Sequence, residues 1–495
     1  MSIGATAQAT PPGSAKSASP IRTLRNSDAA VLTAMLLSLG LLYIVPGLIS
    51  AAVGGVIFFA LAIYRPNLSL ATVPCAAPLF YRQRAFELSS TRTLNFSLAE
   101  VIVLICVAAW VVREAIDMSR RPQGERLTPI LQALRGKASL LRQPVVWLAV
   151  AFLLIGVLWL FIPPNIIRNI ALREFRVTVL EPVLFLALIL RWIRTPADVW
   201  RLVGAWLVTS ALVGREAVEQ FLFGEAALME GVGRATSIFP SATALGIYLG
   251  KALPLAVVLA FLLPPAWRFW RAAAALLSIA IGLGVIASFA RGAWIGVAVA
   301  LAIVAFIARN RRMLIGLAAA FVAGLAALPF INVTRITSMF DFNTEDNTGV
   351  ARAKIWASAL KIIGDHPFTG IGQDQFLYQD PKYGVPQLRL FTISHPHNWV
   401  LDFWLRLGLP GLLWLLATLI YFFRQTYTLW AKLRGTATGA LLLGLMASMI
   451  DFAVHGLLDM AYFTMDSALT FWLTFGLVTI LQNQHDTSKS LSGKG

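Results

Sequence analysis

The segment "ISHPHNWVLDFW" (393–404) carries two of the five histidines of the chain, His395 and His397, directly before Asn398. Asparagine is a favourable N-cap, so a helix is expected to begin at Trp399. The positive end of that helix disfavours protonation of a nearby imidazole, and a neutral imidazole can accept a proton near pH 7. The pattern predicts a catalytic corner made of His397, His395 and Asn398. The alternative is that the histidines only close a loop or bind a metal ion adventitiously.

Arginines form the second group of candidate residues. They lie near the ends of apolar segments, on the side of the membrane where basic residues are normally scarce. Arginine binds phosphate through paired hydrogen bonds, so this group predicts a diphosphate-binding site. The candidates are Arg173, Arg176, Arg215, Arg234 and Arg291. The alternative is pairing with nearby acidic residues, namely Glu174, Glu181, Glu216 and Glu219.

Composition defines the class of protein that positions these residues. The chain has 495 residues, of which 58% are hydrophobic and 13% are charged, whereas soluble domains average about 25% charged residues. Many apolar runs reach the ~17–25 residues that a helix needs to cross a bilayer. Backbone groups in lipid must be paired internally, which favours helices for such runs. We therefore expect an all-α polytopic membrane protein with about 12–14 transmembrane helices.

The net charge of +17 does not indicate nucleic-acid binding. Basic residues are densest in the segment 113–142, which the predicted topology places on the inner side of the membrane. This is the usual positive-inside bias, with added contact to anionic membrane lipids. Neither a nucleic acid nor a nucleotide is expected as a partner, and the sequence has no Walker A motif.

The predicted organisation has five parts. They are a disordered cytoplasmic tail (1–29), a transmembrane helical bundle (30–330), an external catalytic loop (331–398), C-terminal transmembrane helices (399–482) and a cytoplasmic tail (483–495). The large external loop is thus inserted before the last three spans. One segment, 66–80, is interrupted by Pro74 and Pro78 and either crosses the membrane or re-enters it. Within the loop, the apolar spacing of residues 349–363 predicts a helix.

No metal or other cofactor is expected. The acidic residues of the external loop form no D-x-D pair, and the sequence contains neither H-E-x-x-H nor a Cys/His cluster. The two cysteines, Cys75 and Cys106, are too few for a disulfide framework.

Five segments together resemble the O-antigen ligase/O-antigen polymerase superfamily of bacterial membrane glycosyltransferases. They are "LREFRVTVLEPVLF" (172–185), "GRATSIFPSATALGIYL" (233–249), "SFARGAWIG" (288–296), "RAKIWASALKIIGDHPFTGIGQDQF" (352–376) and "HPHNWVLDFWLRLGLPGLLWLL" (395–416). Their order, and their separation by spans and one large loop, carry the resemblance, which covers roughly residues 160–425.

The resemblance implies a metal-independent enzyme of the bacterial cytoplasmic membrane, with its active site on the outer face. Such enzymes transfer a glycan from an undecaprenyl-diphosphate carrier to an acceptor glycan or glycolipid, as in lipopolysaccharide assembly. A polymerase of polysaccharide repeat units and a protein-glycosylating relative use the same donor and stay open as alternatives. A transporter or flippase for lipid-linked sugars is the competing class, and the more deeply placed Lys251 and Asp451 would fit it.

Three site residues follow from the family pattern. Its two arginines fall on Arg234 and Arg291, and its histidine before asparagine falls on His397. The pattern thus favours His397 over His395 as the base. The chain departs from the family where an asparagine normally follows the proline of the second segment, because Ser241 stands there instead.

Overall fold

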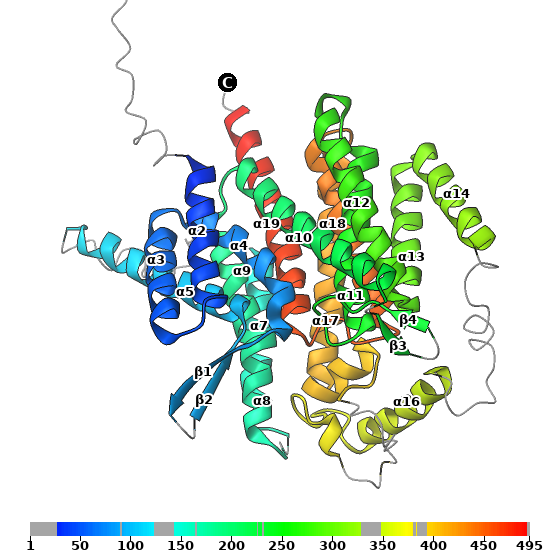
Figure 1. Cartoon of the computed structure of the whole chain (residues 1–495), viewed down its shortest axis with the longest axis horizontal. Coiled ribbons are helices and arrows are strands. Elements are labelled where there is room, and N and C mark those ends of the chain that lie inside the picture. Colours follow the sequence, from blue (N-terminus) through cyan, green and yellow to red (C-terminus); the bar gives the residue numbers. More distant parts are fainter. Residues whose placement is uncertain are drawn as a thin grey trace, which may run out of the picture.

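The computed structural model describes residues 27–89, 92–122, 143–163, 166–224, 226–229, 232–327, 348–379, 383 and 394–492. Helices make up most of this part of the chain (Figure 1). The strands within it form two short antiparallel hairpins, β1 (Arg84–Ser89) with β2 (Arg92–Phe96) and β3 (Ala227–Met229) with β4 (Val232–Arg234). The all-α class predicted from composition is confirmed.

The helices follow the predicted apolar segments closely. In chain order they are α2 (Asp28–Tyr43), α3 (Leu48–Tyr64), α4 (Pro66–Ala76), α5 (Leu98–Ser119), α7 (Pro144–Leu158), α8 (Arg168–Glu174), α9 (Glu181–Trp192), α10 (Pro196–Leu222), α11 (Ala242–Leu262), α12 (Arg268–Ser288), α13 (Arg291–Ala308), α14 (Arg311–Ala327), α16 (Thr348–Asp365), α17 (Trp399–Lys432), α18 (Ala437–Gly456) and α19 (Met465–Ser492). A π-helical turn (Phe175–Leu180) joins α8 to α9. The predicted helix at 349–363 is confirmed as α16.

Six helices of the described chain are long and apolar enough to cross a membrane. They are Ala242–Leu262, Pro265–Ser288, Arg291–Ala308, Trp399–Lys432, Ala437–Gly456 and Met465–Ser490. Helices α2, α3 and α7 are apolar but shorter. The polytopic membrane architecture is therefore confirmed. The remaining predicted spans correspond to helices that are shorter, or that contain more charged residues, than these six.

Some predicted regions lie outside the described residues. They include residues 1–26 of the N-terminal tail and residues 331–347 and 384–393 of the predicted external loop. The proline-interrupted segment 66–80 forms α4, with Pro74 inside it, followed by a short 3₁₀ turn (Ala77–Tyr81), and most of its side chains are buried.

Helices α13 and α18 pack closely, and glycines make this possible. A Cβ atom at Gly292 would lie 2.7 Å from His455 Cδ2, and one at Gly296 would lie 2.4 Å from Asp451 Oδ1. Both distances are shorter than real contacts allow, so a side chain at either position would displace His455 or Asp451. The start of α13, which is Arg291, is consequently fixed beside the end of α18.

The described part of the central insertion packs against the start of α17, at the lower edge of the molecule in Figure 1. Ile371 N donates to Leu405 O at 2.7 Å, and Trp404 Nε1 donates to Pro367 O at 2.6 Å. A small apolar cluster, including Ile355 of α16, fills the space between them. The insertion therefore holds the first turns of α17 in place.

A buried charge cluster anchors the same region. Arg406 Nε donates to Asp402 Oδ1 at 2.7 Å, one helical turn away in α17. Arg406 Nη1 also lies 2.9 Å from Glu174 Oε1 at the end of α8. A buried charge is costly without partners, and the two acids provide partners for Arg406. Because Glu174 belongs to α8 and Arg406 to α17, the contact links these two helices.

Candidate active site

The two histidines lie in a turn that is held from both sides. His397 has a φ of 52°, in the left-handed region that few non-glycine residues adopt. Trp356 Nε1 of α16 donates to Pro396 O at 2.8 Å, and Asn398 Nδ2 donates to Leu457 O at 3.0 Å, just beyond α18. These contacts maintain an otherwise unfavourable backbone conformation.

Asn398 is the N-cap of α17, as predicted. Its Oδ1 accepts hydrogen bonds from Val400 N at 2.9 Å and Leu401 N at 3.2 Å. The cap fixes the position where the histidine turn meets the helix.

Asp459, in the segment after α18, joins the two histidines. His397 Nδ1 lies 3.0 Å from Asp459 Oδ1, and His395 Nε2 lies 3.5 Å from the same oxygen. The centroids of the two imidazole rings are 4.3 Å apart. Arg352 Nη2 of α16 lies 3.3 Å from the other oxygen, Oδ2. One buried carboxylate therefore organises side chains from three segments.

The electrostatics of this cluster keep Asp459 ionised. Burial opposes its ionisation, but hydrogen bonds to His395 and His397 lower the pKa of this carboxyl well below its usual range. An ionised carboxylate only accepts hydrogen bonds, so we assign the proton of neutral His397 to Nδ1. Its Nε2 then has a lone pair available. The His397 side chain is 28% exposed, so its imidazole is held in a fixed orientation at the surface.

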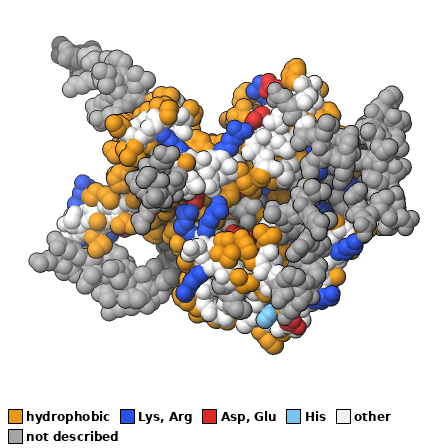
Figure 2. Space-filling model, turned by 60° about the horizontal axis from the view of Figure 1, so that its bottom comes forward, with side chains coloured by type: hydrophobic (Ala, Val, Ile, Leu, Met, Phe, Trp, Pro, Cys, Tyr) orange, Lys and Arg blue, Asp and Glu red, His pale blue; other side chains and the backbone are white. Residues whose placement is uncertain are grey.

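Two of the predicted arginines lie at the turn between α12 and α13, which packs beside the end of α18. Arg234 Nε donates to Ser288 O at 3.1 Å, and Nη2 lies 3.5 Å from Phe289 O, in the turn that joins α12 to α13. Arg291 begins α13 directly after this turn. The next residue, Gly292, packs against His455, four residues before Asp459. A continuous set of contacts thus leads from both arginines to the histidine cluster. Figure 2, in which the bottom of the view in Figure 1 comes forward, shows basic side chains interspersed with apolar ones.

The other three predicted arginines have different surroundings. Arg176 binds two buried acids, with Nη2 at 2.6 Å from Glu100 Oε1 and Nη1 at 2.9 Å from Glu181 Oε1. Arg215 pairs with Glu219 at 2.9 Å on the surface. Arg173 is exposed at the end of α8. The carboxylate pairing considered as the alternative is therefore present at Arg176 and Arg215.

Asp459 and Arg352 were not among the predicted site residues. One sequence feature could have drawn attention to Asp459. Asp451, His455 and Asp459 are spaced at four-residue intervals in "DFAVHGLLD", which places polar side chains along one face of a helix. This spacing alone does not indicate that the last of them contacts a distant histidine turn.

The deeper charge Lys251 has partners of its own. Its Nζ donates to Ser467 Oγ at 2.7 Å and to Ala461 O at 3.2 Å. Asp451 faces the backbone of α11 and α13, where a Cβ at Gly250 would lie 3.1 Å from its Oδ2. These hydrogen bonds link α11 to α19 and to the segment that precedes it.

The cluster also offers metal ligands. His395, His397 and Asp459 each present one ligand atom, and these atoms all lie within 4.8 Å of one another. Two imidazoles and a carboxylate suit a transition-metal ion such as Zn²⁺. The guanidinium of Arg352 beside Asp459 opposes such an ion by charge repulsion. The donor set thus permits a metal, and the neighbouring charge disfavours it.

Comparison with protein families supports the resemblance seen in the motifs. Residues 273–416 match the family model described as O-antigen ligase. The matched segment includes Arg291, Arg352 and both histidines of the turn, whereas Arg234 and Asp459 lie outside it. No curated protein was found to match the chain.

Proposed function

We propose that this chain acts as a member of the O-antigen ligase superfamily and transfers a glycan from an undecaprenyl-diphosphate carrier to an acceptor sugar, at the outer face of the bacterial cytoplasmic membrane. The observation that carries the proposal is the pairing of His397 with Asp459, with the turn that holds Arg234 and Arg291 packed beside the end of the same helix, α18. A positioned base and a group of cations are the two elements that such a transfer needs.

In the proposed reaction, the acceptor hydroxyl oxygen bonds to the anomeric carbon of the glycan. The bond between that carbon and the carrier diphosphate breaks, and its electron pair leaves with the diphosphate. His397 Nε2 takes the hydroxyl proton, and ionised Asp459 stabilises the resulting imidazolium. Arg234 and Arg291 bind the negative charge that grows on the diphosphate.

The same chemistry serves a polymerase of repeat units, in which the acceptor is a second lipid-linked glycan. Purified protein in lipid nanodiscs can be given the donor together with a glycolipid acceptor, with a second lipid-linked glycan, or with no acceptor. Ligase activity predicts carrier release that depends on the glycolipid. Carrier release that needs only lipid-linked glycan favours the polymerase. In sealed vesicles, movement of intact donor across the membrane without release of the diphosphate would support the transporter class instead.

The Asp459→Asn variant is expected to lower the transfer rate about tenfold to a hundredfold. The amide keeps the shape of the side chain but no longer stabilises the imidazolium by charge. Initial transfer rates at saturating donor measure the effect. Asp486→Asn, at an exposed position near the end of α19, is the matched control. A full rate for Asp459→Asn would remove Asp459 from the proposed mechanism.

Chelation of metal ions is expected to leave the transfer rate unchanged, because arginines take the place of a metal. Added Zn²⁺ is expected to inhibit. A metal bound to His397 Nδ1 leaves the proton of the neutral ring on Nε2, so this nitrogen can no longer accept the proton of the acceptor hydroxyl. Rates with EDTA, with excess Zn²⁺ and after re-chelation test both statements. Loss of activity with EDTA and its recovery with a divalent ion would make the His395/His397/Asp459 cluster a catalytic metal site.

A further inference from the structure

A pocket of about 550 Å³ lies at the opposite end of α13 from the candidate active site. Helix α13 begins at Arg291 and has 18 residues, so its ends are about 27 Å apart at ~1.5 Å per residue. This is close to the ~30 Å thickness of the hydrocarbon core. The pocket and the candidate active site therefore lie near opposite faces of the membrane.

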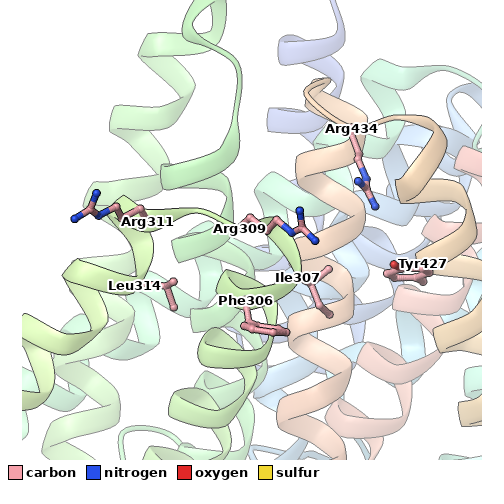
Figure 3. Close-up of a pocket in the computed structure, with 7 residues that line it drawn as sticks. All are labelled: Phe306, Ile307, Arg309, Arg311, Leu314, Tyr427 and Arg434. Atoms are coloured by element: carbon pink, nitrogen blue, oxygen red, sulfur yellow. The ribbon is translucent and has the colours of Figure 1, made fainter.

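Three arginines from two helix junctions line this pocket. Arg309 follows the last residue of α13, Arg311 begins α14, and Arg434 lies in the turn between α17 and α18. In Figure 3 the guanidinium groups of Arg309 and Arg434 extend into the same space. Arg434 is also held over the Trp430 ring, at 4.3 Å from its centroid. The lining residues include no acid.

The rest of the pocket wall is apolar or aromatic. It is formed by Phe306, Ile307, Leu314 and Tyr427. The Phe306 side chain is largely exposed on the surface of the molecule, where a membrane helix meets lipid. The pocket thus combines cationic groups at the level of the membrane interface with an apolar surface on the side of the bilayer core (Figure 3).

We propose that this pocket binds the phosphate headgroup of an anionic phospholipid, with the acyl chains lying against Phe306, Ile307 and Leu314. Guanidinium groups make paired, charge-assisted hydrogen bonds to phosphate. Within the described residues, Arg309 and Arg434 form no ion pair, so a bound phosphate would compensate their charge. A lipid with two phosphates matches the charge of the three arginines better than a lipid with one phosphate. A zwitterionic headgroup is less favourable, because its cationic amine is repelled by the arginines.

The bound lipid would join the ends of helices that also form the active site. Helices α13 and α18 both run from this pocket to the corner that contains Arg291 and Asp459. A headgroup shared by Arg309 and Arg434 ties α13 to the turn between α17 and α18. The expected effect is higher stability of the helical bundle, independent of whether the chain catalyses glycan transfer.

Thermal unfolding of the full chain in detergent tests the proposal. Cardiolipin is expected to raise the unfolding midpoint most, phosphatidylglycerol less and phosphatidylcholine least. The double variant Arg309→Gln/Arg434→Gln is expected to lose most of the cardiolipin shift. Arg312→Gln is the control, because it removes the same charge from the neighbouring first turn of α14 at a residue that does not line the pocket.

Equal cardiolipin shifts in the double variant and the wild type would overturn the proposal. An equal shift with inorganic phosphate, at the same phosphate concentration, would overturn the assignment to a lipid. Both arginines are exposed, so the variants are expected to fold. Native mass spectrometry of each single variant gives a second readout, in which reduced cardiolipin retention relative to Arg312→Gln is the expected result and unchanged retention contradicts the proposal.

Discussion

Replacing His397 by asparagine is expected to lower the rate of glycan transfer by about 10²–10⁴-fold, the usual contribution of a positioned general base. Asparagine tolerates the left-handed backbone conformation at this position better than most residues. Its amide can still donate to Asp459, but it cannot accept the acceptor proton. The substitution therefore removes the base while preserving the turn. The transfer rate at saturating donor and acceptor measures the loss.

The matching variant His395→Asn distinguishes the two histidines. His395 Nε2 lies farther from Asp459 Oδ1 than His397 Nδ1 does, and its Nδ1 lies 3.1 Å from Ser394 Oγ. We therefore expect a smaller loss for His395→Asn than for His397→Asn. The reverse order would assign the base to His395, and full activity in both variants would exclude the histidine turn from the chemistry.

Replacing Arg234 and Arg291 together by glutamine is expected to lower the rate by about 10²-fold or more, as the loss of a transition-state charge donor typically does. Donor affinity should fall as well, because the ground-state diphosphate is already charged. Paired measurements of donor binding and of single-turnover transfer separate the two effects. Lysine substitutions keep the charge but lose the paired hydrogen bonds, so partial activity is expected from them.

Arg268→Gln is the matched control for this pair. Arg268 is exposed at the other end of α12 from the turn that Arg234 contacts. The same assay tests the remaining predicted arginines, Arg173, Arg176 and Arg215. Unchanged donor binding in the Arg234/Arg291 double variant would contradict their role in binding the diphosphate, and a large loss in the others would extend the site toward α8 or α10.

The features that sequence predicted well depend on nearby residues. Apolar runs predicted the helices, including α16, and the residue type before Trp399 predicted the cap of α17. In each case the interacting groups lie within one or two helical turns. Their geometry follows from the helix itself, so it could be inferred without a tertiary structure.

The contacts that sequence missed join distant parts of the chain. Asp459 lies 62 residues from His397, and Glu100 lies 76 residues from Arg176. The approach of α18 to α13 at Gly292 brings His455, and with it Asp459, to the corner. Such partners depend on helix packing, which the pattern of a single segment does not specify. For the same reason, sequence could not decide which arginines already have carboxylate partners.

The most direct test of the proposed function is a reconstituted reaction in which both products are counted. Purified wild-type protein and His397→Asn are incubated in nanodiscs with an undecaprenyl-diphosphate-linked glycan, a glycolipid acceptor and EDTA. The wild type is expected to release carrier diphosphate and form glycosylated acceptor in equal amounts, while the variant forms at most about one hundredth as much. Equal product formation by the two proteins, or none by the wild type with either a glycolipid or a lipid-linked acceptor, would contradict the proposal.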